Sequence, residues 1–369
     1  MRAAVLTATG APVEIEELRD PAPRTGEVLV EVTTCGVCHT DLHVMKGEVA
    51  FPLPAVLGHE VSGVVAEVGP GVRRVRAGDR VVASFIMPCG YCPRCVRGQE
   101  DLCETFFAMN RLKGTLYDGE TRLFRPDGSP VSMYSMGGLA ERCVVPETDV
   151  FPVPDSLRLE DVAILGCSSL TAYGALRNVA DLRVGDTVAI VATGGVGSSL
   201  VQLSAAFGAS DIIAIDISDE KLDAAAKLGA THTVNSRAAD PVEAVRAITR
   251  GRGVDVAFEV LGSAATFATA ASVVADGGRV VVVGIAPAGV AGEIDLSRLP
   301  RRQLKVLGSY GGRPRTDMPA LLALVERGVL APQRVVSRRF GLDQAAEAYQ
   351  ALARGEIVGR AVVDIAGAR

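Results

Sequence analysis

The second half of the chain alternates strand-like apolar segments with helical ones, and this alternation restricts the fold more than any other feature. Strand candidates cover residues 188–192, 212–216, 254–258, 279–283 and 304–308, and helical patterns cover 218–228 and 241–249. Strands and helices that alternate at this spacing form a parallel sheet with helices on both faces. We therefore predict a doubly wound α/β domain in this half.

The first of these strands leads into a glycine-rich turn, Thr193-Gly194-Gly195-Val196-Gly197, and then into a helical pattern. Gly194 and Gly197 allow the backbone to approach a pyrophosphate, and the helix N-terminus offers free N–H groups to the anion. The full dinucleotide fingerprint has a further glycine where this chain has Ala192, and a methyl group is tolerated there if φ stays negative. The turn predicts a dinucleotide site.

Asp216 ends the next strand, 22 residues beyond Gly194. A carboxylate at this position binds the ribose hydroxyls of the adenosine and repels a 2′-phosphate, which favours NAD over NADP. The alternative is that Asp216 is only an acidic residue near the N-terminus of the helix at 218–228.

The first 160 residues show short strands interrupted by Gly and Pro, at 27–33, 61–68, 80–84 and 140–145. After residue 310 the chain has one helical pattern, 318–327, and a strand-like end, 359–365. Such a tail is too small to fold alone, whereas 369 residues are enough for two domains. We predict one domain of residues 1–168 and 310–369, with a nucleotide-binding domain of residues 169–309 inserted into it.

Four of the eight cysteines lie within a span of fifteen residues: Cys89, Cys92, Cys95 and Cys103. In a large chain without secretory features, short Cys-x-x-Cys spacings indicate a metal site rather than disulfides. Four thiolates complete tetrahedral zinc and leave no position for a substrate, which is typical of a structural site. An iron–sulfur cluster is the alternative metal centre.

A second set of potential ligands, Cys38, His59 and Cys167, comes from three separate segments. Three protein ligands leave a fourth zinc position open, where a Lewis acid holds a substrate oxygen. Each residue also has a simpler interpretation, as an ordinary buried core residue.

The charge distribution excludes several classes of partner. The net charge is −5 and no polybasic tract occurs, so we expect neither a nucleic acid nor an anionic membrane as a partner. The apolar start of the chain is too short for a signal peptide, and no run of about 18 apolar residues predicts a membrane span. We expect a cytoplasmic protein.

Several motifs together resemble the zinc-containing alcohol dehydrogenases of the medium-chain dehydrogenase/reductase family, over essentially the full length. They are Gly36-Val37-Cys38-His39-Thr40-Asp41-Leu42-His43, Gly58-His59-Glu60, the four-cysteine segment and the glycine turn. The resemblance implies a GroES-like β-rich catalytic domain with an inserted Rossmann domain, two zinc ions per subunit and NAD. It further implies the reversible oxidation of a small-molecule alcohol to an aldehyde or ketone.

The resemblance also implies roles for residues around the catalytic zinc. Cys38, His59 and Cys167 would hold the ion, Glu60 would lie behind it, and Asp41 would fix the tautomer of His59. Thr40 and His43 would form a proton relay, and Phe85 would line the substrate pocket.

Residues that would contact the cofactor follow in the same way. Gly194, Gly195, Val196 and Gly197 form the turn, and Asp216 and Lys221 would face the adenosine ribose. Thr171, Val196 and Val283 would contact the nicotinamide, and His39 and Arg360 the pyrophosphate.

The segment at 114–124 resembles the long form found in dimeric animal and formaldehyde-oxidising members. We therefore expect a homodimer in which edge strands of two nucleotide domains pair, with the apolar region 280–285 contributing, and a tetramer as the alternative.

Three alternative functions stay open. The four-cysteine segment alone is compatible with a zinc-ribbon nucleic-acid binder, and a catalytically silent relative would keep the fold as a binding or structural protein. Among enzymes, the second candidate reaction is the oxidation of a thiol adduct of formaldehyde.

Overall fold

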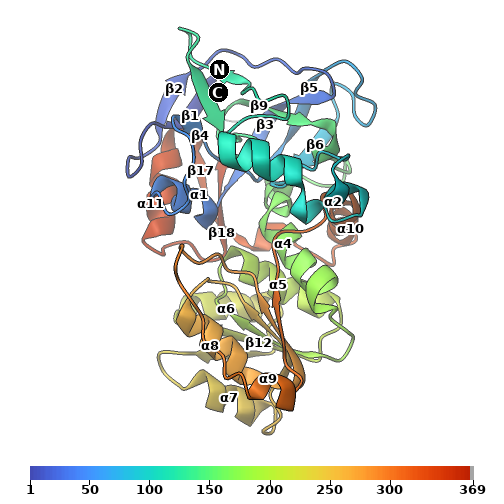
Figure 1. Cartoon of the computed structure of the whole chain (residues 1–369), viewed down its shortest axis with the longest axis vertical. Helices are drawn as coiled ribbons and strands as arrows, with labels where there is room; N and C mark the ends of the chain where they lie inside the picture. The colour runs from blue at the N-terminus through green and yellow to red at the C-terminus, as the bar shows by residue number, and fades with distance from the viewer. Residues whose placement is uncertain (366–369) are drawn as a thin grey trace. The chain divides into compact units, whose positions relative to one another are not determined.

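The computed structural model describes residues 1–365 and divides into two compact units (Figure 1). The first unit comprises Met1–Leu170, Arg313–Gly328 and the chain from Val336 on; the second comprises Thr171–Gly312 and Val329–Val335. The second unit therefore includes a short piece of the tail, 329–335, that we expected in the first domain. Residues 366–369, the end of that tail, lie outside the described residues.

The first unit contains two β-sheets. The strands of the larger sheet are β3 (Glu27–Val37), β5 (Val61–Val68), β6 (Arg80–Ala83), β9 (Arg142–Pro146), β10 (Val150–Pro152), β17 (Val336–Gly341) and β18 (Arg360–Asp364). Their order is β10-β6-β5-β3-β18-β17, and β9 also pairs with β3. The smaller sheet has the order β2-β1-β4-β8-β7, with β1 Arg2–Leu6, β2 Glu14–Glu17, β4 Ala55–Val56, β7 Leu123–Phe124 and β8 Pro130–Met133.

The C-terminal tail completes the larger sheet, because β18 pairs antiparallel with β3 and places Val363 opposite Cys35. The helices of this unit are α1 (His39–Met45), α2 (Pro93–Val96), α3 (Leu159–Val162), α10 (Pro314–Glu326) and α11 (Ala345–Ala353). A further helix, α4 (Ser168–Gly174), begins in the first unit, and its residues from Thr171 on belong to the second unit.

Our prediction of a single helix after residue 310 was wrong, because α11 follows α10. Its buried residues Ala345, Ala348, Tyr349 and Leu352 have the i, i+3, i+4, i+7 spacing of a helix with one apolar face. The helical pattern in the sequence was weak, because most of the buried residues of this helix are alanines, which are only slightly apolar.

The second unit is a doubly wound α/β domain, as predicted. Its strands are β11 (Thr187–Val191), β12 (Asp211–Asp216), β13 (His232–Asn235), β14 (Val254–Glu259), β15 (Val274–Val282) and β16 (Lys305–Gly308). Its helices are α5 (Gly195–Ala206), α6 (Asp219–Leu228), α7 (Pro241–Ile248), α8 (Ala264–Val273) and α9 (Arg298–Arg301). All neighbouring strands are parallel, in the order β13-β12-β11-β14-β15-β16. This order reverses beside β11, where such sheets bind nucleotides.

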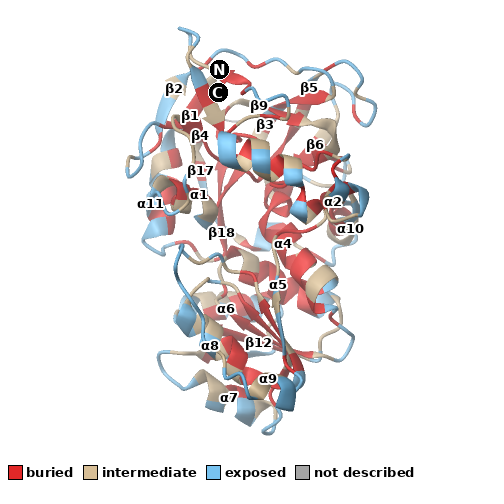
Figure 2. Cartoon of the chain, viewed as in Figure 1, coloured by how far each residue is buried: buried red, intermediate tan, exposed pale blue. Residues whose placement is uncertain are grey.

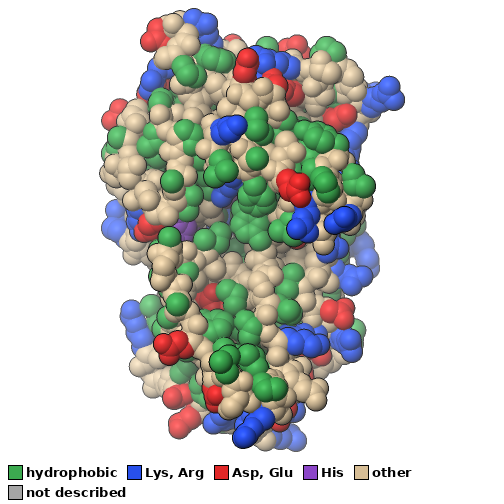
Figure 3. Space-filling view, viewed as in Figure 1, with side chains coloured by type: hydrophobic (Ala, Val, Ile, Leu, Met, Phe, Trp, Pro, Cys, Tyr) green, Lys and Arg blue, Asp and Glu red, His purple; other side chains and the backbone are tan. Residues whose placement is uncertain are grey.

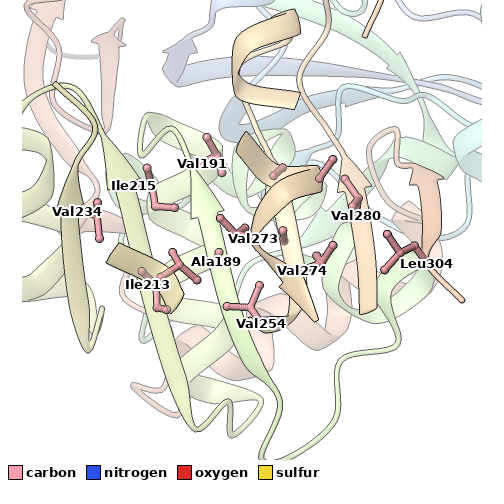
Figure 4. Packing of buried hydrophobic residues seen from close by; sticks show 14 residues of the cluster. Ala189, Val191, Ile213, Ile215, Val234, Val254, Val273, Val274, Val280 and Leu304 are labelled. Carbon is pink, nitrogen blue, oxygen red and sulfur yellow. The ribbon is translucent and has the colours of Figure 1, made fainter. Parts of the chain in front are cut away.

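The core of the second unit explains why its central strands are apolar throughout. All five residues of β11 are buried, because helices cover both faces of the sheet (Figure 2). Figure 4 shows Ala189 and Val191 in a cluster of buried residues that includes Ile213 and Val254 from the two neighbouring strands. The rigid sheet formed in this way fixes the position of the glycine turn at the end of β11.

The position of β15 bears on part of the expected dimer contact, residues 280–285. Val280 and Val281 are fully buried, and β15 lies between β14 and β16. The strand that ends the sheet on this side is β16, in which Val306 is 42% exposed. Residues 280–282 are therefore not available at an edge.

The surface is mixed in charge: in the view of Figure 3, acidic and basic side chains are interspersed. Among residues 1–365, no helix has both the length and the apolar composition needed to cross a bilayer.

Candidate active site

Three segments of the first unit bring Cys38, His59 and Cys167 together. Cys38 precedes α1 at the end of β3, His59 precedes β5, and Cys167 precedes α4. One sulfur or nitrogen atom of each lies within 4.8 Å of the others, and all three residues are buried. The sequence-based grouping is therefore a cluster in space.

Two motif glycines allow this close packing. A Cβ atom on Gly36 would lie 1.8 Å from a carboxylate oxygen of Glu60, and one on Gly58 would lie 2.7 Å from the sulfur of Cys35. Gly58 also has φ +90°, a conformation that other residues rarely adopt. Glycine is needed in both motifs because β3 and the segment that carries His59 pack too closely for a side chain at these positions.

The imidazole of His59 is oriented for metal binding. Its Nδ1 lies 3.0 Å from Oδ1 of the buried Asp41, whereas its buried Nε2 has no hydrogen-bond partner among the described residues. Burial alone would lower the pKa of His59, but the charges of Asp41 and Cys38 raise it to about 10. A buried nitrogen that faces two thiols and lacks a partner fits a zinc ligand.

The two thiols of this cluster affect the pKa of each other. A hydrogen bond from Cys167 holds the pKa of Cys38 well below its usual range, and the charges of Arg360 and His59 act in the same direction. The same hydrogen bond, together with burial, raises the pKa of Cys167. The site thus stabilises negative charge on the sulfur of Cys38, and a thiolate is the form that binds zinc.

The four other predicted ligands form a second, separate cluster. One sulfur from each of Cys89, Cys92, Cys95 and Cys103 lies within 4.8 Å of the others. Backbone N–H groups donate hydrogen bonds to these sulfurs. The nitrogen of Cys92 lies 3.3 Å from Sγ of Cys89, and the nitrogen of Cys89 lies 3.3 Å from Sγ of Cys103. Such donors outweigh burial at Cys92 and lower its pKa to about 6. The cluster fits a closed zinc site, and no disulfide occurs among the described residues.

In the second unit, the glycine turn begins α5. Gly194 caps this helix, and nothing lies within 4 Å of a Cβ atom built on it. A Cβ atom on Gly197 would lie 2.2 Å from the carbonyl oxygen of Ala192. The first position is therefore open for a ligand, and the second is closed by helix–strand packing, as the dinucleotide fingerprint requires.

Ala192 does not meet the condition under which we accepted it, because its φ is +78°. An L-residue in this region costs about 1–2 kcal/mol relative to glycine. The turn keeps the geometry of the glycine fingerprint and imposes it on the alanine.

Asp216 has a contact that the sequence did not predict. Its Oδ2 accepts hydrogen bonds from the N–H and hydroxyl of Thr193, at 2.8 and 3.1 Å, and its Oδ1 accepts one from the N–H of Ile217 at 2.7 Å. The carboxylate therefore anchors the glycine turn to the end of β12. The other predicted cofactor residues of this unit are Lys221 in α6, Val283 just after β15 and Thr171 in α4.

Comparison with known proteins agrees with this geometry. Residues 24–155 match the family described as alcohol dehydrogenase GroES-like domain, and residues 195–327 match the zinc-binding dehydrogenase family. A putative alcohol dehydrogenase D of Mycobacterium tuberculosis is 36% identical and covers 98% of this chain and 99% of its own length. An S-(hydroxymethyl)glutathione dehydrogenase of Escherichia coli is 34% identical and covers 97% and 98%, respectively.

A solved structure also agrees along the whole chain. Benzyl alcohol dehydrogenase from Acinetobacter calcoaceticus has a TM-score of 0.93 and 32% identity, and covers 99% of both chains. The chain belongs to the zinc-dependent alcohol dehydrogenase family. It is an alcohol oxidoreductase with a GroES-like domain and a Rossmann domain, and NAD is the cofactor typical of this family.

In this alcohol dehydrogenase, two aromatic rings lie beside the ring of His59. Phe85, which we predicted to line the pocket, has its ring centroid 6.0 Å from that of His59. Tyr134, which we did not predict, lies 5.9 Å away and is fully buried. No sequence signal identifies Tyr134, since it lies in an irregular segment after β8.

The two predicted relay residues both lie in α1. The hydroxyl oxygen of Thr40 is 3.4 Å from the sulfur of Cys38, so Thr40 borders the metal position. His43 lies one turn further along, and its Nδ1 contacts the carboxylate of Glu48. This hydrogen bond lowers the pKa of Glu48, which therefore stays ionised near neutral pH. Glu48 is a partner that the motif does not contain.

Glu60 and Arg360 pair inside the first unit. Nε of Arg360 donates to Oε2 of Glu60 at 3.0 Å, its Nη2 contacts Oε1, and the N–H of Ser168 also donates to Oε1, at 3.0 Å. Burial would lower the pKa of Arg360, but the charges of Cys38 and Glu60 raise it well above its usual value. The predicted contact of Arg360 with the pyrophosphate stays a prediction. His39, also predicted there, is the first residue of α1.

Proposed function

We propose that Cys38, His59 and Cys167 hold the catalytic zinc, and that alcohols are oxidised there with hydride transfer to NAD. The observation that carries this assignment is the buried Nε2 of His59, which faces two thiol groups and lacks a hydrogen-bond partner among the described residues. Metal analysis of the purified protein should give two zinc ions per subunit. A single ion would leave only the four-cysteine site and contradict the assignment.

The zinc would supply a Lewis acid that polarises the substrate oxygen, and NAD would accept the hydride. The residues around the site would exclude water and transfer the proton. Phe85 and Tyr134, whose rings lie beside that of His59, would help to exclude water from it. Thr40 borders the metal position and suits the inner end of a proton relay.

His43 would form the outer end of this relay. Its Nδ1 is held by Glu48, so its Nε2 is left to receive a proton from the interior. The histidine is 23% exposed and Glu48 is 32% exposed, so the proton has a short way to solvent. Histidine suits this position because its charge changes near neutral pH.

In the second unit, the turn from Gly194 to Gly197 would bind the pyrophosphate at the N-terminus of α5. Asp216 would bind the adenosine ribose and favour NAD over NADP. Lys221, Thr171, Val196 and Val283 keep the contacts proposed for them from the resemblance.

For assembly and location, we propose a cytoplasmic homodimer, with a tetramer as the alternative and without nucleic acid or membrane as a partner. The exposed edge strand β16 supports pairing between two nucleotide units. Light scattering at several concentrations should give about twice 38.4 kDa, and Val306→Lys should shift the protein toward monomer. A parent protein that is monomeric at all concentrations would contradict both assemblies.

A second candidate substrate is a thiol adduct of formaldehyde, which the name of the Escherichia coli relative and the long segment 114–124 support. One cation is also suitably placed: the guanidinium of Arg111 lies 4.1 Å above the ring of Tyr134, which in turn borders His59. An anionic adduct would find a counter-charge there. Two assays that follow the formation of reduced NAD separate the candidates. One uses a panel of alcohols, and the other uses formaldehyde in the presence and absence of glutathione.

A further inference from the structure

Asp41 lies between the ligand His59 and a residue from the far end of the chain. Its Oδ1 is 3.0 Å from Nδ1 of His59 and also accepts a long hydrogen bond, 3.4 Å, from the N–H of Gly58. Its Oδ2 accepts a hydrogen bond from the hydroxyl of Tyr349 at 2.9 Å. Tyr349 lies in α11, the helix that the sequence did not predict. One oxygen of the carboxylate thus contacts the segment that carries His59, and the other contacts α11.

All three side chains are removed from water. Asp41 is 0% exposed, and His59 and Tyr349 are each 1% exposed. A buried carboxylate is stable only if hydrogen-bond donors compensate for its lost hydration. Burial and the charge of Asp41 raise the pKa of Tyr349 well above its usual value, so its hydroxyl remains a donor.

The hydroxyl also limits rotation of the carboxylate. The χ2 torsion of aspartate is broad and has no sharp staggered preference. A donor fixed to Oδ2 therefore determines where Oδ1 points, and Oδ1 determines the orientation of the imidazole. The tyrosine acts on the metal ligand through one intervening side chain.

We propose that Tyr349 is a positioning residue for the catalytic zinc: through Asp41 it holds Nε2 of His59 toward the ion. This inference rests on the proposed metal site. It makes the C-terminal tail part of that site, because the hydrogen bond joins residues 308 positions apart. The chain thus completes its zinc site only after the nucleotide unit has been synthesised.

The test is the rate at which the zinc-loaded protein releases its two ions to a chelator. Tyr349→Phe removes one oxygen atom and keeps the ring in the core. We expect it to accelerate release of the catalytic ion about ten-fold, at the lower end of the range for partners of metal-binding histidines, and to leave the four-cysteine ion unchanged. Cys167→Ala and Cys103→Ala assign the two release phases.

Tyr117→Phe is the matched control. The hydroxyl of Tyr117 contacts the carbonyl oxygen of Met87, near the four-cysteine cluster and away from Asp41. This variant loses the same atom from a partly buried tyrosine, so release of the catalytic ion should stay at the parental rate. Thermal unfolding of both variants shows whether general loss of stability explains any difference.

A double-mutant cycle separates positioning from packing. In an Asp41→Asn background, Tyr349→Phe should have little further effect, because an amide has one acceptor oxygen and cannot accept from both His59 and Tyr349. Equal acceleration in both backgrounds, or a parental release rate in Tyr349→Phe itself, would overturn the positioning role. A parent protein that carries only one zinc ion would instead refute the proposed metal site.

Discussion

Nε of Arg360 lies 3.0 Å from Oε2 of Glu60, although 300 residues separate them in the chain, and both side chains are buried. Strand pairing produces this contact, since β18 lies next to β3. A buried ion pair is costly to break from one side, because the remaining charge has no counter-charge.

This pair gives the first prediction. Arg360→Met should lower the free energy of unfolding by about 3–5 kcal/mol, because it leaves Glu60 as an isolated buried charge. Glu60→Gln combined with Arg360→Met should be more stable than Arg360→Met alone. Denaturant unfolding of the variants measures both effects, and equal stability of the single and double variants would show that the charges are not coupled.

The two zinc sites should respond differently to loss of one ligand. Cys167→Ala should abolish turnover while the fold survives, whereas Cys103→Ala should chiefly destabilise the protein, because its site is structural. Acid should remove both ions, since thiolates and imidazole bind protons in competition with zinc. The measurements are the zinc content, thermal unfolding and activity of each variant. Full activity of Cys167→Ala would exclude that residue as a ligand.

The glycine turn offers a matched pair of substitutions. Gly194→Ala has free space for its Cβ and a φ of −69°, so it should fold normally yet weaken NAD binding at least about ten-fold, or ~1.4 kcal/mol. Gly197→Ala places its Cβ against the carbonyl of Ala192 and should destabilise the protein by roughly 1–3 kcal/mol. Unfolding curves and NAD titrations of both proteins are the measurement. Normal NAD affinity in Gly194→Ala would place the pyrophosphate elsewhere.

Asp216 should show two separable effects. Asp216→Ala should reduce the preference for NAD over NADP, and it should also lower stability by about 1–3 kcal/mol, because the buried N–H of Thr193 loses its acceptor. Asp216→Asn keeps an acceptor oxygen, so it should change the cofactor preference with a smaller loss of stability. Comparable kcat/KM for NAD and NADP in the parent enzyme would exclude a role of Asp216 in selecting the cofactor.

The proton relay predicts a pH-dependent defect. His43→Gln should lower alcohol oxidation near neutral pH by roughly ten- to a hundred-fold, at the low end of general-base catalysis, and activity should partly recover at high pH. Thr40→Ala should be more severe and should not recover, because Thr40 is the inner residue. Glu48→Gln keeps the histidine and should have a smaller effect than His43→Gln. Identical pH–rate profiles for the parent and His43→Gln would mean that the proton leaves by another route.

Features that depend on local pattern could be predicted from the amino-acid sequence. Alternating strands and helices specified the parallel sheet, because side-chain periodicity and short connections are local properties. The spacing of Cys89 to Cys103 identified one cluster of ligands within a single segment. Cys38, His59 and Cys167 were grouped by resemblance to a family, and the tertiary structure brings their ligand atoms together.

Contacts between residues distant in the chain could not be predicted in this way and are known from the folded structure. Tyr349 and Arg360 reach Asp41 and Glu60 because the tail returns to β3 and α1, and no local pattern encodes that return. The positive φ of Ala192 is likewise imposed by its surroundings, against the preference of an alanine. Local sequence fixes which elements form and which residues are chemically competent; packing between distant segments fixes their partners, because that packing buries the side chains and sets their orientation.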